Sequence, residues 1–525
     1  PGPKGPKVRC PPKRGKTSEH LDEVLSWADR ALGGWQSQPP TSIRDHSLTM
    51  VWALMQAGDA MLIRPNALAT AASVSPESAL AYLKALATSF GQTDPLVRVA
   101  EQVRFAPYIE VSPDEYFLTV AGNDLWALRP LFERTIKGER YARHRGRWLE
   151  DRAVDLLASA LAPDNVQKGV RLIDPDDGTE FGEIDGLLRF DDTVLLIEAK
   201  AASMRPGARR GGRALQRHLK ETLGKASEQT SVALDVLLGR WPAIVRDATG
   251  EVVDLGQGVR EVHPILVTLD DLSAVAPVVW EMAGSGVLPQ EATIPWIVTL
   301  HELDLVCQTV ASPVQFIHFL RRRSRLNEIG GRIASDELDW WMLYLKSGLY
   351  FKDDPAEGAV RYLSQTDALD AWVLFQRGLR DTPAEKPRQQ IDQGSERILR
   401  CLADERPPGW VAAACTILEA SGESQEELGR SLKKARRRAR KRGLVQRGTY
   451  GYSSGEEPML ICFVVVPDDR VSTLAQALED YVSERLEEAG LQRVLGLGIA
   501  ASTERPYDAL LVLERSVWNA PRSLA

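Results

Sequence analysis

Two short stretches of this sequence place charged side chains inside apolar, strand-like runs. Asp185 lies in "GEIDGLL", and Glu198 and Lys200 follow the aliphatic run "TVLLI". Residues two apart on a strand point to the same face, so Glu198 and Lys200 are expected side by side. A buried carboxylate is costly unless a cation or hydrogen-bond donors satisfy it. Two or three converging carboxylates favour a hard divalent cation such as Mg²⁺, bound through oxygen ligands.

The segment between the two runs decides whether these side chains meet. The residues from Phe190 to Thr193 can turn between two neighbouring strands. Asp185 and Glu198 are then expected near one end of a sheet. Glu183 shares a face with Asp185 by the same alternation, but a solvated strand end is the favoured interpretation for it.

A glutamate on the preceding helix pattern is the third candidate. Glu150 lies in register with Val154, Leu157 and Leu161, at i, i+4, i+7 and i+11. This spacing places Glu150 on the inward face of the helix, near its start. An inward glutamate is an informative exception to the usual burial of apolar residues, and we expect it to complete the carboxylate cluster.

The surrounding elements predict an α/β layer that positions these side chains. Apolar periodicity indicates, in order, a helix, three strands, a second helix and a fourth strand, over residues 143–161, 167–173, 182–190, 193–201, 213–238 and 262–269. This α-β-β-β-α-β order predicts a sheet with helices packed on it.

These residues and this order resemble the PD-(D/E)XK nuclease superfamily, which has the restriction-endonuclease-like fold. The stretch "GEIDGLL…LLIEAKA" is especially similar to the Mrr, Holliday-junction resolvase and NERD-like branches. One departure is that Ile184, rather than a proline, precedes Asp185, which those branches tolerate. The resemblance covers residues 141–270 and implies a metal-dependent nuclease core there.

The resemblance implies a catalytic role for five side chains: Glu150, Asp185, Glu198, Lys200 and Gln229. Asp185, Glu198 and the backbone carbonyl of Ala199 would hold Mg²⁺ or Mn²⁺, with Glu150 completing the site. Lys200 would orient the attacking water and stabilise charge in the transition state. The glutamine, on the following helix, resembles a polar residue that many members place beside the site.

Structural interpretations that involve no catalysis compete with this one. A lone E-x-K is common because Ala, Glu and Lys favour helices, and "LLIEAKAASM" is itself compatible with a helix. The turn-like "DDT" and the paired "EID" strand favour the strand interpretation. In a third interpretation, Glu198 and Lys200 simply pair on a strand of a scaffold, which requires Asp185 and Glu150 to lie elsewhere.

Two basic stretches are candidates for contact with phosphates. Residues 205–220 follow the E-x-K strand without an acidic residue, and the candidate contacts there are Arg209, Arg210, Arg213 and Arg217. Residues 430–442 hold nine Lys or Arg in thirteen positions, with candidate contacts Arg436, Arg437, Arg438 and Arg440. Ser424 and Glu427 are expected to cap this second helix and Gly443 to end it. A solvated loop and a solvated or protein-binding helix face are the alternatives.

Other motifs have structural explanations. "GLGIAAS" at 496–502 leads into a strand rather than a helix, which argues against a dinucleotide-binding loop. Thr299 and Glu302 form a capping-box pattern rather than part of a zinc helix. Trp340 and Trp341 are expected to pack between helices rather than stack on bases.

Length and composition set the remaining limits. The chain has 525 residues, enough for several domains, and its net charge of −7 excludes a generally basic nucleic-acid coat. The five cysteines are scattered, which argues against a disulfide framework or a zinc site. No apolar run approaches the ~18 residues of a membrane span. Without an apolar signal region, we expect a cytoplasmic protein with no membrane partner.

The predicted architecture is a restriction-endonuclease-like αβββαβ core flanked by helical domains, with a small C-terminal α/β domain. Its segments are a disordered basic tail, a helical N-terminal domain, the nuclease-like core, a second helical domain and the α/β domain with the basic helix, at 1–18, 19–140, 141–270, 271–405 and 406–525.

The resulting functional hypothesis is a metal-dependent endonuclease that hydrolyses phosphodiester bonds. DNA is favoured over RNA because it is the usual substrate of the family that the chain resembles. By analogy, the expected biological role is prokaryotic defence or DNA processing. The alternative is a nucleic-acid-binding or interaction protein whose nuclease fold is inactive or gated by a partner. Cleavage specificity, a regulatory protein partner and a homo-oligomer stay open.

Overall fold

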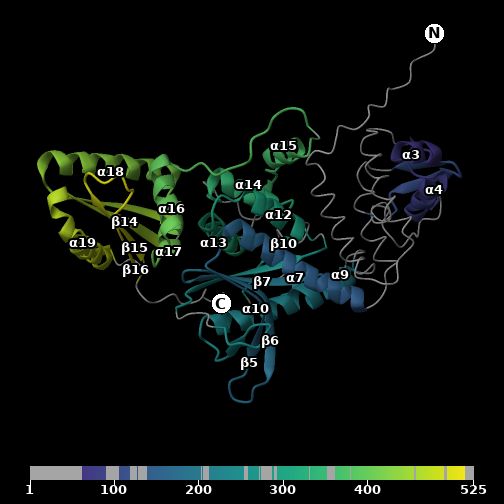
Figure 1. Cartoon of the computed structure of the whole chain (residues 1–525), viewed down its shortest axis with the longest axis horizontal. Coiled ribbons are helices and arrows are strands. Elements are labelled where there is room, and N and C mark those ends of the chain that lie inside the picture. The colour runs from purple at the N-terminus through teal and green to yellow at the C-terminus, as the bar shows by residue number, and fades with distance from the viewer. Residues whose placement is uncertain are drawn as a thin grey trace, which may run out of the picture. The chain divides into compact units, whose positions relative to one another are not determined.

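The described residues of the computed structural model belong to two compact units. The first combines Pro1–Trp148 with Ser203–His218, and the second combines Leu149–Ala202 with Leu219–Ala525. Helices and mixed sheets occur together in the chain (Figure 1), so the predicted α/β class is confirmed. The predicted tail at 1–18 lies outside the described residues, which are 62–89, 106–118, 127, 139–202, 204, 208, 212–253, 258–270, 272, 286–288, 293–329, 332–351, 361–378, 380–454, 457–489 and 493–514.

The first unit contains two short helices and a four-stranded sheet in the order β1-β4-β3-β2. Its elements are β1 (Leu62–Ile63), α3 (Pro65–Ala72), α4 (Pro76–Ala85), β2 (Ala87–Ser89), β3 (Tyr108–Ser112) and β4 (Glu115–Leu118). The Ser75 side chain caps α4 by accepting from the N–H of Ser78, as predicted. The strands were not predicted, because runs of two to five residues are too short to display a clear alternation.

A six-stranded sheet organises the second unit, in the order β10-β9-β7-β6-β5-β8. Its strands are β5 (Asn165–Ile173), β6 (Glu180–Phe190), β7 (Thr193–Lys200), β8 (Ile244–Arg246), β9 (Glu261–Thr268) and β10 (Trp296–Thr299). Strands β5, β6 and β7 pair antiparallel, whereas β7, β9 and β10 run parallel. The predicted turn between β6 and β7 occurs at Asp191, whose φ of 55° is left-handed.

Helices precede and follow the three antiparallel strands in the predicted order. Helix α7 (Glu139–Leu161) comes before β5, and a helical run after β7 consists of α9 (Gly212–Leu219), a π-helical turn η1 (Lys220–Gly224) and α10 (Lys225–Leu237). The prediction of one continuous helix over 213–238 was therefore wrong at the π turn. A Cβ at Gly224 would lie 2.7 Å from the carbonyl oxygen of Val287, so glycine permits a close approach there.

Helices α7 and α10 cover opposite faces of this sheet. Leu187 and Leu196, which are partners across β6 and β7, pack with Ala233 and Val236 of α10. Gly186 and its partner Ile197 point the other way, because successive residues on a strand alternate between faces. A Cβ at Gly186 would lie 2.3 Å from Cγ2 of Val154, so α7 rests directly on the β6 backbone at this point.

A helical region follows the sheet. It contains α12 (Leu300–Thr309), α13 (Pro313–Ile329), β11 (Arg332–Ala334), α14 (Glu337–Ser347), β12 (Arg361–Leu363) and α15 (Asp367–Gln376). Thr299 and Glu302 form the predicted capping box, and Trp340 and Trp341 are buried, as the packing interpretation requires. Within the described part of the chain, every helix is too short or too polar to cross a membrane.

The last elements form an α/β region around a four-stranded sheet with the strand order β13-β14-β15-β16. They are α16 (Gln393–Glu405), α17 (Trp410–Leu418), α18 (Gly422–Arg442), β13 (Gln446–Ser454), β14 (Glu457–Val466), η3 (Asp468–Thr473), α19 (Leu474–Ala489), β15 (Arg493–Ala500) and β16 (Ala509–Glu514). Strands β14 and β15 are parallel, and the other pairs are antiparallel. Strand β13 was not predicted, since "QRGTYGYSS" has weak alternation and two glycines.

Two local predictions in this region have different outcomes. The cap of α18 is Ser421, which accepts from the N–H of Ser424, so the predicted cap at Ser424 was wrong. Serines three residues apart give the same local pattern, and the helix starts at the earlier one. Gly443 ends the helix in a left-handed conformation, as predicted. Gly496 and Gly498 lie within β15 rather than in a ligand loop, and a Cβ at Gly496 would lie 2.6 Å from Val482 of α19.

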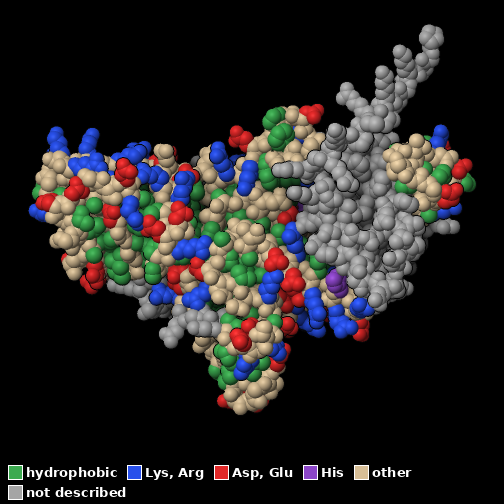
Figure 2. All heavy atoms as spheres, in the orientation of Figure 1, with side chains coloured by type: hydrophobic (Ala, Val, Ile, Leu, Met, Phe, Trp, Pro, Cys, Tyr) green, Lys and Arg blue, Asp and Glu red, His purple; other side chains and the backbone are tan. Residues whose placement is uncertain are grey.

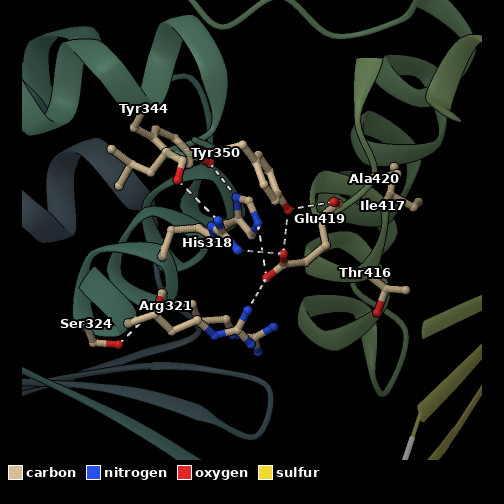
Figure 3. Close-up of polar contacts among 12 residues, drawn as sticks. His318, Arg321, Ser324, Tyr344, Tyr350, Thr416, Ile417, Glu419 and Ala420 are labelled. Atoms are coloured by element: carbon tan, nitrogen blue, oxygen red, sulfur yellow. Dashed lines mark hydrogen bonds and ion pairs between the residues drawn. The ribbon is translucent and has the colours of Figure 1, made fainter. Parts of the chain in front are cut away.

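A buried polar cluster joins α13 and α14 to the residue that follows α17 (Figure 3). The Nδ1 atom of His318 lies 2.9 Å from the Tyr344 hydroxyl, and its Nε2 atom lies 3.5 Å from Glu419. Tyr350 donates a hydrogen bond to Glu419 at 2.7 Å. Burial lowers the pKa of His318, against the pull of the adjacent carboxylate. Because His318 is fully enclosed, this cluster holds helices together and offers no access to a substrate.

Candidate active site

Asp185 and Glu198 lie opposite each other where the pairing of β6 and β7 ends. The register runs from Phe190 and Thr193 at the turn to Gly186 and Ile197. The next step places Asp185 across from Glu198, on the sheet face that α10 covers. There, Asp185 Oδ2 accepts a hydrogen bond from the backbone N–H of Ala199 at 2.7 Å. This contact fixes the aspartate against β7.

The lysine of the E-x-K run connects the strand to the following helix. Lys200 Nζ is hydrogen-bonded to Glu198 Oε1 and donates a second hydrogen bond to Gln229 Oε1 at 3.0 Å. Glu198 is buried, with 6% of its surface exposed, whereas Gln229 is exposed on α10. The ammonium therefore provides the positive charge that a buried carboxylate needs, and its neighbour on α10 holds it in place.

Glu150 reaches the same region from α7. It lies one turn before Val154, the residue that packs on Gly186, and it is half-buried. Burial and, to a smaller extent, the negative charge of nearby Asp185 raise the pKa of Glu150 to about 7. Glu183, which is exposed, adds a smaller effect of the same sign.

Burial is also the main cause of the raised pKa values of the other two carboxyls. Burial and the charge of Asp185 raise the pKa of Glu198, Lys200 opposes this rise, and the resulting pKa is about 7. Burial also raises the pKa of Asp185, while the Ala199 N–H and Lys200 lower it. Crowded carboxyls that resist ionisation near neutral pH are typical of sites that bind a cation or move a proton.

These shifts predict how the metal-free protein responds to pH. A carboxyl whose pKa rises from 4.5 to about 7 on folding is more easily protonated in the folded state. Its ionisation therefore reduces the free energy of unfolding as pH rises through this window. In EDTA, the melting temperature of the wild type should fall between pH 5 and pH 7.5, and Glu150→Gln should fall less.

The comparison of variants isolates this residue from other buried carboxyls. Burial also raises the pKa of Glu302 to about 7, so Glu302 contributes to the decrease of the melting temperature with pH in every variant. Glu183→Gln, which removes an exposed carboxylate that has only a smaller effect on the pKa of Glu150, serves as the control and should change the slope much less than Glu150→Gln does. If Glu150→Gln and Glu183→Gln show equal slopes, Glu150 does not share the environment described above.

The predicted metal ligands differ in how closely the structure gathers them. Asp185, Glu198 and Lys200 meet at the end of the β6–β7 hairpin, and Gln229 joins them through the lysine. Ala199 takes part through its amide N–H. Among the described residues, no three or more His, Cys, Asp or Glu side chains lie close enough together to hold a metal ion. Metal binding would therefore require the carboxylates to turn toward one another.

The predicted phosphate contacts fall into two groups. Arg213 and Arg217 are exposed on α9, within the other compact unit, and Arg209 and Arg210 lie outside the described residues. The second group lies on α18, where Arg436 is half-buried and the other three, Arg437, Arg438 and Arg440, are exposed. Contact with nucleic acid stays a prediction for both groups.

Comparison with known proteins does not identify the role of this site. No protein-family model and no curated protein matches the chain. A solved structure described as "Crystal structure of protein VC1899 from Vibrio cholerae" is similar to part of the chain, with a TM-score of 0.19 and 12% sequence identity. The similarity covers 55% of this chain and 55% of that one, so the chain spans about half the length of that protein.

Proposed function

We propose that the β6–β7 hairpin, α7 and α10 carry the active site of a metal-dependent nuclease of the PD-(D/E)XK type. One observation carries the proposal: just beyond the last pair of β6 and β7, Asp185 accepts a hydrogen bond from the N–H of Ala199, and Lys200 is hydrogen-bonded to Glu198 on either side of that residue. The α-β-β-β-α-β order, which α7, β5, β6, β7, α10 and β9 follow with the short strand β8 inserted before β9, and the position of Gln229 support it. A strand pair held only by packing has no need for these charges in a buried position.

The donor set fits a hard divalent cation, Mg²⁺ or Mn²⁺. Glu150, Asp185 and Glu198 would supply carboxylate oxygens, and the Ala199 carbonyl would join them. Burial is the main cause of the raised pKa values of these carboxyls, repulsion between them adds to it, and a bound cation would favour their charged forms. When bound, such a cation lowers the pKa of water and offsets charge on the phosphate. Affinity for it should rise with pH, because binding must displace protons from these carboxyls.

The side chains of the chain have separate roles in the proposed hydrolysis. Lys200, which Gln229 holds through its ammonium, would donate to the phosphate oxygens as they gain charge. Its bond to Glu198 would then be exchanged for one to the substrate. The Ala199 N–H keeps Asp185 in a fixed orientation, so little reorganisation is needed on that side of the site.

A second function is favoured by one specific observation. The Lys200 ammonium forms an ion pair with Glu198, and the described carboxylates are not gathered around a cation-sized gap. This arrangement is expected for a nucleic-acid-binding protein whose nuclease fold is inactive, or whose site becomes active only when a protein partner binds. DNA remains the favoured substrate over RNA, by the resemblance alone.

A cleavage assay decides between these functions. We expect the full-length chain to cleave at least one of single-stranded DNA, double-stranded DNA or RNA when Mg²⁺ or Mn²⁺ is present, and EDTA should abolish cleavage. Products on a denaturing gel, over a range of metal concentrations, provide the measurement. Absence of cleavage on all three substrates with either metal would favour the inactive or gated protein.

A further inference from the structure

Helix α18 carries a basic pocket that the proposed active site does not use. The pocket has a volume of about 470 Å³ and is lined by Lys433, Arg436, Arg437, Arg440 and Lys441. These residues recur at i, i+3, i+4, i+7 and i+8, so they form one face of the helix. Lys and Arg side chains gather densely over α18, at the upper left of the space-filling view (Figure 2).

The charges of this pocket are only partly offset within the described part of the chain, where Asp508 acts on Arg436 and Asp468 interacts with Arg440. None of its five side chains forms an ion pair there, although Arg430, earlier on the same helix, pairs with Glu426 at 3.6 Å. Like charges at i and i+4 destabilise a helix. The helix dipole favours cations only in the last turn, which explains Arg440 and Lys441 but not Lys433. An anion bound from outside would remove the repulsion.

Two of the five residues are anchored, and three are free. Arg436 donates to the backbone carbonyls of Thr503 at 2.9 Å and Pro506 at 3.3 Å, and Arg440 donates to that of Ala501 at 2.7 Å. These bonds tie α18 to the loop after β15 and fix both guanidinium groups. The free residues, which are exposed and hydrogen-bond to no described residue, are Lys433, Arg437 and Lys441.

The anchoring loop lies at the edge of the sheet where ligands commonly bind. It follows the carboxyl end of β15, and Asp468, which follows the parallel strand β14, accepts a bond from the N–H of Ser502 at 3.0 Å. In open α/β sheets, ligands bind outside the carboxyl ends of parallel strands. The pocket therefore combines cations that form no ion pair among the described residues with a position at the edge of the sheet where ligands commonly bind.

The lining residues identify the class of ligand. The described residues that line the pocket include no aromatic side chain on which bases could stack. From Lys433 to Lys441 the helix rises by about 12 Å, at 1.5 Å per residue. A row of cations of this length matches several consecutive phosphates of a strand, which follow one another at about 3.4 Å along the axis, better than a single phosphate.

We propose that the α18 pocket binds the phosphate backbone of a nucleic-acid strand without reading its sequence. Lys433, Arg437 and Lys441 contact the phosphates, and Arg436 and Arg440 position the helix and add to the local field. Arg438 does not line the pocket and makes no such contact. This inference deepens the proposed nuclease function by giving the substrate a second binding surface that takes no part in the chemistry.

The test compares two triple variants that remove the same charge from the same helix. K433Q/R437Q/K441Q removes three of the positive charges that line the pocket, and K434Q/R438Q/R442Q removes three exposed cations that do not line it. Both are made in the full-length chain with Asp185→Asn and assayed in EDTA, so cleavage has no influence on the result. The probe is a fluorescein-labelled oligothymidylate, and the measurement is its anisotropy over a series of salt concentrations.

The pocket variant should weaken binding about tenfold or more and lower the salt dependence by roughly two units of slope, at about 0.7 per lost contact for a single strand. The control variant should change the affinity less than about threefold. Equal losses in both variants would overturn the proposal in favour of diffuse attraction. Inorganic tripolyphosphate that competes better than unlabelled oligonucleotide at equal phosphate would overturn it in favour of a small-anion site. Because only binding is measured, the result is independent of whether the chain cleaves nucleic acid.

Discussion

Asp185→Asn should abolish metal-dependent cleavage while the fold remains intact. Asparagine keeps an oxygen that can accept the Ala199 N–H bond, so the contact between β6 and β7 survives. The substitution removes the negative charge that the proposed site needs for Mg²⁺, and the metal affinity should fall with activity. Without metal, the melting temperature should stay the same or rise, because Asp185 raises the pKa of both Glu150 and Glu198 by repulsion.

Lys200→Ala separates the catalytic interpretation from the scaffold interpretation at the same site. If Lys200 stabilises the transition state, its loss should slow cleavage by roughly 10²–10³-fold and leave metal binding nearly unchanged. If the lysine only neutralises Glu198, its loss should leave a buried carboxylate unpaired and lower the melting temperature markedly. Cleavage rates, metal titrations and melting curves of the same preparations distinguish the two outcomes.

A matched lysine controls for the general effect of removing a positive charge. Lys168 lies on β5 of the same sheet, is partly exposed and pairs with Asp155 at 2.7 Å and Asp151 at 3.2 Å. Lys168→Ala should leave the cleavage rate within about twofold, as expected for a surface ion pair. A loss of activity equal to that of Lys200→Ala would remove any special role for Lys200.

Sequence periodicity predicted four strands of the sheet that carries the site, β5, β6, β7 and β9, because they are long, whereas β8 and β10, of three and four residues, were not predicted. The run from Thr193 to Lys200 is β-branched and aliphatic, and the two aspartates before it have strong turn character, so the hairpin follows locally. The short strands of the first unit and β13 escaped the same reasoning. Their segments have too few alternating positions, so tertiary pairing rather than local pattern sets their structure.

The candidate site was predictable in its membership but not in its contacts. Alternation alone placed Glu198 and Lys200 on one face, and the turn placed Asp185 opposite them. No pattern in the sequence specifies that the Ala199 N–H binds Asp185, or that Gln229 holds the lysine, because these contacts depend on how the strands diverge and how α10 crosses them. Likewise, the density of charge on α18 did not separate Lys433 and Lys441, which line the pocket, from Arg438, which does not.

Gly186 is the residue near the site that sequence reasoning overlooked. An isolated glycine inside a strand pattern is a signal for close approach of another backbone or helix. Here, α7 lies so close that an added Cβ would be 2.3 Å from Cγ2 of Val154, a fully buried side chain, and 3.5 Å from Ile197. The glycine therefore sets the height of α7 above the sheet, and with it the position of Glu150 one turn earlier.

Gly186→Ala should consequently destabilise the fold by about 1–3 kcal/mol, the usual cost of overpacking a core. It should also reduce cleavage, because α7 must move away and carry Glu150 with it. Val154→Ala removes the clashing methyl groups, so the double variant should be more stable than the sum of the two single effects predicts, by about 1 kcal/mol or more. Denaturant unfolding of the four proteins measures this coupling.

Gly182→Ala is the matched control for this cycle. Gly182 lies on the same strand, but a Cβ there would lie 3.3 Å from the flexible end of Leu172, which can turn aside. Gly182→Ala should therefore cost less than Gly186→Ala, and Val154→Ala should not change its effect. Independent effects of Gly186→Ala and Val154→Ala would show that α7 does not rest on Gly186. The position of Glu150 would then need another explanation, whatever the cleavage assay finds.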